Sequence, residues 1–334
     1  MDVFELTRRL VDIESITSNE EAIGLYLFDY LAPMAEAYGG HVEKMPVEPR
    51  RFNVFARWGE PVVTLSTHLD TVPPFFPSRE DNEVIWGRGA CDVKGCIAAM
   101  TKAAEALLAQ GVRNFGLLFV VGEERNSLGA LTAARNPRGA RFLVNGEPTE
   151  NRLALGSKGS WRIEVATHGR MAHSAYPELG ESAIDKLLDV LQDVRRVPLP
   201  RDPVLGGGTL NIGVISGGRA ANVIPDEARA ELMIRVVDGG ESTREAVLAA
   251  VAGRADVREL LRIPAVRLGT LEGFETTVVS YTTDIPAFGE AWGRPFLIGP
   301  GSIHYAHTAE ERVPKAQLAR AVEIYQEIVK RLLS

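Results

Sequence analysis

Apolar residues follow two spacings in roughly the first 150 residues of the chain. One helical face near the start carries Val3, Leu6, Leu10 and Val11. Three short, continuous apolar runs have the length of buried strands: residues 62–67, 115–121 and 142–144. Between these runs, residues 94–111 and 127–135 are rich in Ala and Leu and favour helices. Strands that alternate with helices predict an α/β fold, in which helices cover a mostly parallel sheet.

The pattern changes between residues 158 and 267. Residues 160–169 and 228–238 alternate between apolar and polar side chains, as strands with one exposed face do. Residues 181–194 and 242–253 have the spacing of amphipathic helices. We therefore predict an inserted, smaller α+β domain at residues 158–267 with a sheet of its own.

The chain after this insertion returns to the first pattern. Residues 294–302 predict a strand followed by a glycine turn. A last helix has one buried stripe, formed by Leu318, Val322, Tyr325, Val329 and Leu332. We expect residues 1–157 and 268–334 to form one domain together.

Composition and charge restrict the class of protein. The 334 residues suit two domains, and 45% hydrophobic with 24% charged residues is typical of a soluble globular chain. A net charge of -7 disfavours nucleic acid and anionic membranes as partners. Only Cys91 and Cys96 are present, which indicates a reducing compartment. Because the acidic N-terminus does not resemble a signal peptide and no apolar stretch has membrane-spanning length, we expect a cytoplasmic protein.

Polar groups come directly after the predicted strands. His68 and Asp70 follow the first strand, Glu123 and Glu124 follow the second, and Glu147 follows the third. The carboxyl ends of parallel strands form one ligand crevice, so these groups are expected to converge there.

Two further residues, Asp92 before a helix and His307 after the glycine turn, extend this set. Each residue alone has an ordinary structural explanation, since Asp92 can cap a helix and Glu147 can belong to a turn. Carboxylates that converge in a crevice, however, repel one another and resist burial unless a cation is present. Three carboxylates and two imidazoles are enough for two divalent ions if one carboxylate bridges them. Mixed nitrogen and oxygen ligands without a thiolate indicate zinc, with cobalt or manganese as alternatives.

Seven segments carry a resemblance to a known family. They are STHLDTVP, GRGACDVKG, GEERNSLGA, NGEPT, MAHSAYPELG, GGRAANVIPDEARAELMIR and AHTAEERV. In this order they resemble the motifs of the M20 family of zinc-dependent peptidases and deacylases. The resemblance extends from about Asp2 to the last helix. It implies a zinc-peptidase-type catalytic domain with a smaller lid domain, which also forms the dimer interface of a homodimer.

The resemblance also implies a role for individual residues. Its metal ligands correspond to His68, Asp92, Glu124, Glu147 and His307, with Asp92 bridging two ions. Its catalytic set corresponds to Glu123 as the general base, Asp70 as the acid that orients His68, and His173 as a group that reaches the partner subunit's active site to stabilise the oxyanion. Asn222 and Arg235 correspond to substrate-binding residues, Arg235 through the substrate carboxylate.

The three residues between 158 and 267 also have ordinary structural explanations. His173 can cap a helix, Asn222 can form a turn and Arg235 can be an exposed strand residue.

The function that the resemblance implies is hydrolysis of a linear amide in an N-acyl amino acid by metal-activated water, as in acetylornithine deacetylase. A carboxypeptidase, dipeptidase or desuccinylase is the close alternative. An alternative of another class is a noncatalytic protein that binds an amino-acid derivative, but such a protein needs no base such as Glu123 beside its ligand set.

Overall fold

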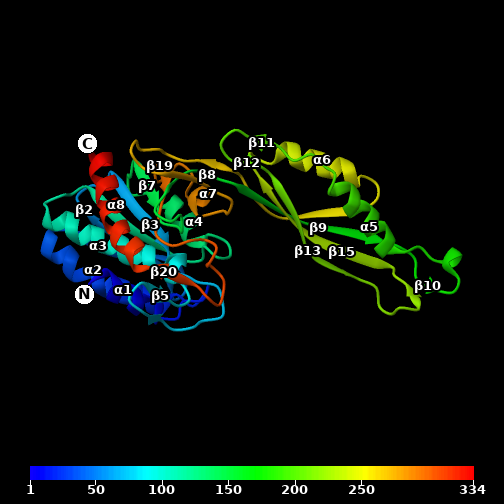
Figure 1. Ribbon diagram of the computed structural model, residues 1–334, viewed down its shortest axis with the longest axis horizontal. Helices are drawn as coiled ribbons and strands as arrows, with labels where there is room; N and C mark the ends of the chain where they lie inside the picture. Colours follow the sequence, from blue (N-terminus) through cyan, green and yellow to red (C-terminus); the bar gives the residue numbers. More distant parts are fainter. The chain divides into compact units, whose positions relative to one another are not determined.

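The computed structural model describes residues 1–334, which form two compact units (Figure 1). Unit 1 comprises residues 1–155, 268–277 and 283–334, and unit 2 comprises residues 156–267 and 278–282. Unit 2 thus begins two residues before the expected boundary at 158 and includes a short later segment. That segment belongs to unit 2 because the Lys158 amide donates to the Val279 carbonyl and the Ser157 hydroxyl donates to the Tyr281 carbonyl.

Unit 1 contains a six-stranded sheet with the order β1-β2-β6-β3-β7-β19. The parallel strands are β3 (Val63–His68), β6 (Phe115–Val120), β7 (Phe142–Asn145) and β19 (Arg294–Leu297). A hairpin, β1 (His41–Glu48) and β2 (Arg51–Trp58), joins the sheet antiparallel to β6. The mostly parallel sheet predicted from the apolar runs is confirmed, and the hairpin was not predicted.

Helices cover both faces of this sheet because alternate residues of a buried strand point to opposite sides. On β6, Phe115, Leu117 and Phe119 belong to one core cluster, whereas Leu118 and Val120 belong to another. The first cluster packs against α1 (Val3–Val11), α2 (Glu21–Tyr38), α3 (Gly95–Ala109) and α8 (Lys315–Leu333). The second packs against α4 (Leu128–Arg135) and α7 (Ile285–Phe288). Figure 1 shows α3 and α8 side by side on one face.

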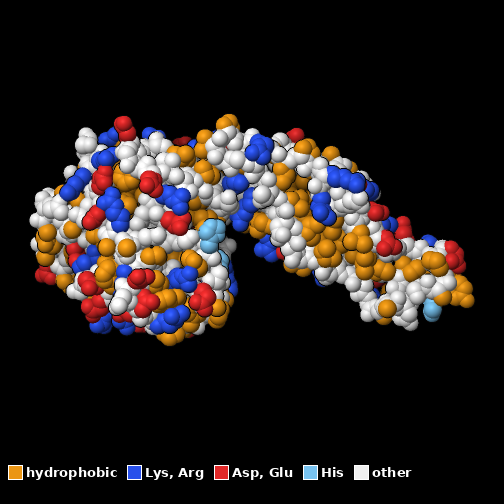
Figure 2. Space-filling model, viewed as in Figure 1, with side chains coloured by type: hydrophobic (Ala, Val, Ile, Leu, Met, Phe, Trp, Pro, Cys, Tyr) orange, Lys and Arg blue, Asp and Glu red, His pale blue; other side chains and the backbone are white.

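Short strands complete unit 1 and its connection to unit 2. One small sheet has the order β20-β5-β4, formed by Arg312–Pro314, Val84–Trp86 and Arg79–Glu80. Another has the order β17-β8-β18, formed by Val266–Arg267, Leu153–Ser157 and Thr276–Val279. Acidic and basic side chains are interspersed on the face of unit 1 shown in Figure 2. No helix of the structure combines the length and apolar character that a membrane crossing requires.

Unit 2 is the α+β domain that the alternating pattern predicts. Its antiparallel sheet has the order β13-β15-β9-β16, formed by Thr209–Gly217, Glu227–Val236, Gly159–His168 and Asp256–Ile263. Inward residues such as Ile163, Val165 and Leu232 pack against α5 (Ala183–Val194) and α6 (Glu241–Val251). Small pairs lie beside this sheet: β10 (Ala172–His173) with β14 (Val223–Ile224), and β11 (Arg201–Asp202) with β12 (Gly206–Gly207).

Candidate metal centre

Three elements of unit 1 bring potential metal ligands together. His68 is the last residue of β3, Asp92 lies in the bend before α3, and Glu124 follows β6 by four residues. One ligand atom from each of these residues lies within 4.8 Å of the other two. The Nε2 atom of His68 is 3.2 Å from the Asp92 carboxylate. Asp92 therefore does not cap α3, because its carboxylate is directed to the histidines.

His307 reaches the same carboxylates from a distant part of the chain. Its Nε2 atom lies 3.1 Å from Asp92 Oδ2 and 3.1 Å from Glu124 Oε1. The backbone of His307 has a φ of 64°, which a non-glycine residue adopts at an energetic cost. Asp92 thus lies between the two imidazoles, the position that a bridging ligand would occupy.

Glu147 approaches the group from the end of β7. Its side chain is buried, and its Oε1 atom has no hydrogen-bond partner. Burial raises the pKa of this carboxyl well above its usual value, and the neighbouring Asp92 carboxylate raises it further. A buried carboxylate oxygen without a partner is costly, which a cation at this place would relieve.

The histidines show how strongly this site favours positive charge. Burial alone would lower the pKa of His68, but contacts with Asp70 and Asp92 raise it well above the usual value. Hydrogen bonds to Asp92 and Glu124 raise the pKa of His307 to about 10. Imidazoles and carboxylates at these distances form a donor set that suits zinc, cobalt or manganese. The residues present therefore fit divalent cations, with His68, Asp92, Glu124, Glu147 and His307 as the available ligands.

Asp70 is buried and connects two arms of the site. The Nδ1 atom of His68 forms its hydrogen bond with the Asp70 backbone carbonyl at 2.9 Å and lies 3.6 Å from Asp70 Oδ1. The same carboxylate accepts hydrogen bonds from the backbone amides of Gly122, Glu123 and Glu124 at 3.0, 3.0 and 3.2 Å. The role of the Asp70 carboxylate in orienting His68 stays a prediction. The structure adds a role that the sequence did not indicate, which is to hold the turn after β6.

Glu123 differs from its neighbour Glu124 although one turn carries both. The Glu123 carboxylate forms no hydrogen bond or ion pair, whereas the Glu124 carboxylate contacts His307. Burial is the main cause that raises the pKa of Glu123 well above its usual value. A carboxylate with a raised pKa that is left free beside a ligand cluster can accept and return a proton.

Asp284 is a further buried acid that the sequence did not reveal. It is 1% exposed, and neither carboxylate oxygen has a hydrogen-bond partner of good geometry. Burial raises its pKa to about 7, and its charge interacts with those of His68 and Glu124. In the sequence, an acid before Ile285 and Pro286 resembles an ordinary helix N-cap, so only the fold places it beside the ligands.

The three predicted residues of unit 2 fall into two groups. His173 and Asn222 are exposed and adjacent, since His173 pairs with Val223 across β10 and β14 and the Asn222 carbonyl accepts from the Ser174 amide. The His173 ring accepts a hydrogen bond from the Ala175 amide at 3.1 Å, so it caps a turn rather than a helix. Arg235 is half-buried on β15 and has no acidic partner. Burial lowers the pKa of its guanidinium.

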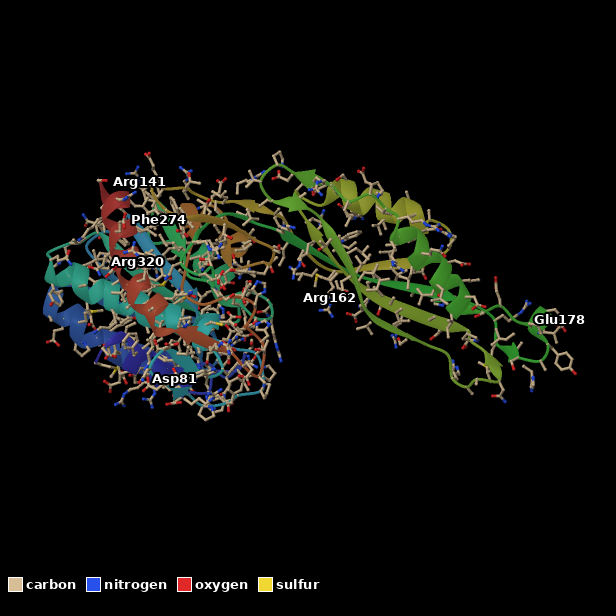
Figure 3. The ribbon with its side chains drawn as sticks, in the orientation of Figure 1. Asp81, Arg141, Arg162, Glu178, Phe274 and Arg320 are labelled. Carbon is tan, nitrogen blue, oxygen red and sulfur yellow. The ribbon has the colours of Figure 1, made fainter.

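These two groups lie at opposite ends of the unit 2 sheet. Arg235 pairs with Ser160, and His168 pairs with Glu227 at the other end of β9. The eight steps from Ser160 to His168 correspond to about 27 Å at a rise of about 3.4 Å per residue. β10 lies beyond His168, and in Figure 3 the nearby Glu178 is far from Arg162 along unit 2.

Comparison with known proteins agrees with this architecture. Residues 64–331 match the sequence profile of peptidase family M20/M25/M40. A probable carboxypeptidase of Neosartorya fischeri is 38% identical over 381 residues, which span 98% of this chain and 85% of that protein. A tripeptidase of Staphylococcus aureus has the same fold, with a TM-score of 0.82, 22% identity and 98% of each chain covered.

A dinuclear metal-binding peptidase of Bacillus subtilis also shares the fold, with a TM-score of 0.71, 16% identity and 99% of this chain and 97% of that chain covered. The profile match covers most of the chain, and the relatives that exceed 30% identity cover nearly all of it. The arrangement of carboxylates around His68 and His307 agrees with a metal-dependent hydrolase. The chain therefore belongs to peptidase family M20/M25/M40.

Proposed function

We propose that this protein hydrolyses the amide bond between an acyl or aminoacyl group and an amino acid whose α-carboxylate is free. N-acyl amino acids and small peptides both contain such a bond, so one site can act on either. The relatives named probable carboxypeptidases favour a dipeptide or short peptide as the better substrate. An N-acetyl or N-succinyl amino acid, as in an acetylornithine deacetylase or a desuccinylase, is the second candidate.

The observation that carries this proposal is the difference in contacts between two adjacent carboxylates, those of Glu123 and Glu124. Glu124 contacts His307 within the ligand set, whereas Glu123 is free of hydrogen bonds and has a raised pKa. Two divalent cations held by this ligand set would polarise the scissile carbonyl and lower the pKa of water. A Glu123 oxygen takes the proton from the attacking water and then gives it to the nitrogen of the departing amine. Because the two carboxylates occupy adjacent positions on one turn, Glu124 can bind metal while Glu123 transfers the proton.

Arg235 supports the preference for a free carboxylate. An arginine that is half-buried without an acidic partner is desolvated without compensation, which a bound carboxylate would supply. A guanidinium matches a carboxylate in bidentate geometry. We therefore assign Arg235 to the substrate α-carboxylate and Asn222 to a polar contact with the substrate.

His173 supports a homodimer in which each active site uses residues of two chains. Because His173 and Arg235 lie at opposite ends of one sheet, one small substrate cannot contact both residues of the same chain. We propose that His173 donates to the developing oxyanion in the active site of the partner subunit, as the family resemblance implies. The exposed ring of His173 is available for such a contact.

The assignment of the base is tested by two matched amide variants, Glu123→Gln and Glu124→Gln. Glu123→Gln should lower turnover by about 10²-fold or more at an unchanged metal content, because general-base catalysis typically contributes that much. Glu124→Gln should lower the metal content as well. Turnover of Glu123→Gln near that of the wild type would refute the role of Glu123.

The substrate is tested with a panel of dipeptides, N-acetyl amino acids and N-succinyl amino acids, each also supplied with its carboxylate amidated. We expect kcat/KM to be highest for a dipeptide and to fall sharply on amidation. Arg235→Met should remove the difference between acid and amide, whereas Arg235→Lys should keep part of it. Equal rates for acid and amide in the wild type would contradict the carboxylate assignment.

The shared active site is tested by mixing chains that carry His173→Ala with chains that carry Glu123→Gln. A heterodimer would then hold one intact site and one doubly defective site, so mixing should restore activity. If His173 acts within its own chain, every site of the heterodimer is defective and purified heterodimers stay inactive.

A further inference from the structure

Glu311 is a buried carboxylate outside the set of proposed ligands. It precedes β20 and is 1% exposed. Its Oε1 atom accepts hydrogen bonds from the backbone amides of Gly89 and Asp92 at 2.9 and 3.2 Å. Its Oε2 atom accepts from Arg88 Nη1 at 2.5 Å. One side chain therefore holds both the start of the bend before α3 and the peptide of Asp92.

The bend needs such support because its backbone is irregular. Asp92 has φ and ψ of -121° and 82°, and Val93 has -138° and 28°, so neither residue is helical. Gly89 has a φ of 86°, in the left-handed region that favours glycine. No regular hydrogen-bond ladder can fix the direction of the Asp92 side chain in a segment of this kind, so side-chain contacts decide it.

Arg88 completes the arrangement from the other side of the carboxylate. It is 2% exposed, its Nε atom donates to the Pro74 carbonyl at 3.2 Å, and its guanidinium lies 4.9 Å from the centre of the Phe76 ring. The ion pair of Arg88 with Glu311 is thus enclosed and anchored. An anchored carboxylate can impose its position on the amides that donate to it.

Glu311 also links two parts of the chain that supply proposed ligands. It lies four residues after His307 and holds the peptide of Asp92, and His307 and Asp92 contact each other at 3.1 Å. We propose that Glu311 is a positioning residue of the metal centre, which, anchored by Arg88, directs the Asp92 carboxylate toward His68 and His307. This inference rests on the proposed metal-dependent function.

The test compares Glu311→Gln with Glu310→Gln, which makes the same chemical change at the exposed neighbouring residue. Zn²⁺ affinity is measured by competition with a chromophoric chelator, and the site geometry is followed through the visible absorption of the Co²⁺-loaded protein. Thermal unfolding of the metal-free protein reports any general loss of stability. A merely structural role would change the unfolding temperature without changing the metal readouts.

We expect Glu311→Gln to weaken binding of at least one Zn²⁺ by about 10–100-fold and to change the Co²⁺ spectrum, as loss of a group that supports a ligand does. Glu310→Gln should match the wild type. Glu311→Asp keeps the charge but withdraws it from the two amides, and it should weaken Zn²⁺ binding in the same way. It also provides the decisive variant if Glu311→Gln does not fold.

Unchanged Zn²⁺ affinity and an unchanged Co²⁺ spectrum in Glu311→Gln or Glu311→Asp would overturn the positioning role while leaving the proposed function intact. If instead the wild type and Glu310→Gln bind no Zn²⁺ above background, the proposed metal-dependent function fails and the positioning role fails with it.

Discussion

The replacement Asp70→Asn tests whether one carboxylate holds the turn that carries Glu123 and Glu124. Asp70 accepts four hydrogen bonds, from the Thr17 hydroxyl and from the amides of Gly122, Glu123 and Glu124. The amide group of asparagine has one accepting oxygen, and its nitrogen can only donate. The Thr17 hydroxyl can rotate to accept from that nitrogen, but a backbone amide cannot.

The magnitude follows from this count of donors. If the asparagine oxygen takes the place of Oδ1, the Glu124 amide loses its partner, which costs about 1–3 kcal/mol for a buried donor. The bonds from Gly122 and Glu123 remain but are no longer made to a charged acceptor, which costs about 1 kcal/mol each. Because an amide is easier to bury than a carboxylate, part of this loss is offset. We expect a net destabilisation of about 2–4 kcal/mol.

The assay is urea unfolding of the metal-free protein followed by tryptophan fluorescence. Trp58, Trp86 and Trp292 lie in unit 1, so the signal reports mainly on the unit that contains Asp70. The midpoint should fall while the dependence on urea concentration stays the same. Zn²⁺ affinity should fall as well, because the turn that presents Glu124 is no longer fixed.

Thr17→Val is the matched control, since it removes only the hydroxyl bond and leaves the three backbone donors paired with Asp70. It should cost about 1 kcal/mol, the net value of one hydrogen bond. The reasoning is refuted if Asp70→Asn unfolds within about 0.5 kcal/mol of the wild type or if Thr17→Val costs as much as Asp70→Asn.

Three further outcomes are expected. Removing metal with a chelator should lower the unfolding temperature measured by calorimetry. Adding Zn²⁺ at about 100 times its Kd should restore about 2.7 kcal/mol of unfolding free energy. An unchanged unfolding temperature would argue against a metal centre. Gly122→Ala should destabilise unit 1 by roughly 1–2 kcal/mol in urea, because its φ is 82° and an added Cβ would lie 3.0 Å from Arg51 Nη2; a neutral effect would show that the turn adjusts freely. The amides of Leu205 and Val204 lower the pKa of Asp202, so its contribution to stability is present above its unfolded pKa of about 3.9 and disappears as the pH falls through its lower folded pKa. Asp202→Asn should therefore lower the unfolding temperature of unit 2 at neutral pH but not in strong acid, and a difference that persists in acid would contradict this origin.

Helices and strands whose apolar residues follow one clear spacing were predictable from the sequence. The helical face of Val3 and Leu6 and the continuous run of β6 specify their elements because their spacing matches one period and every such residue is buried. The pattern did not identify α2, because its apolar residues are distributed over all faces of the helix and because it contains Pro33. It also missed β1, which lies at the edge of the sheet and has half of its residues exposed, so its polar residues resemble a loop.

The residues of the candidate metal centre and their approximate places could also be predicted from the sequence. Acids and histidines that follow buried strands must meet at one edge of a parallel sheet, so His68, Glu124 and Glu147 could be grouped without coordinates. The prediction of a separate task for Glu123 rested on its place beside Glu124 and on the family resemblance, and it stays a prediction. The position of a residue directly after a strand therefore determines which residues it can meet, because parallel strands end at the same edge of the sheet.

Only the tertiary structure decided how these residues are held. Asp70 binds amides more than 50 positions away, and Glu311 binds an amide that lies more than 200 positions earlier in the chain. Bonds between a side chain and a distant backbone leave no local spacing in the sequence, since any acid in a turn has the same pattern. The sequence by itself determined the set of chemical groups and the sheet edge at which they gather. The fold determined which carboxylates receive backbone amides and which remain free for a cation or a proton, because that choice depends on contacts between segments that only folding brings together.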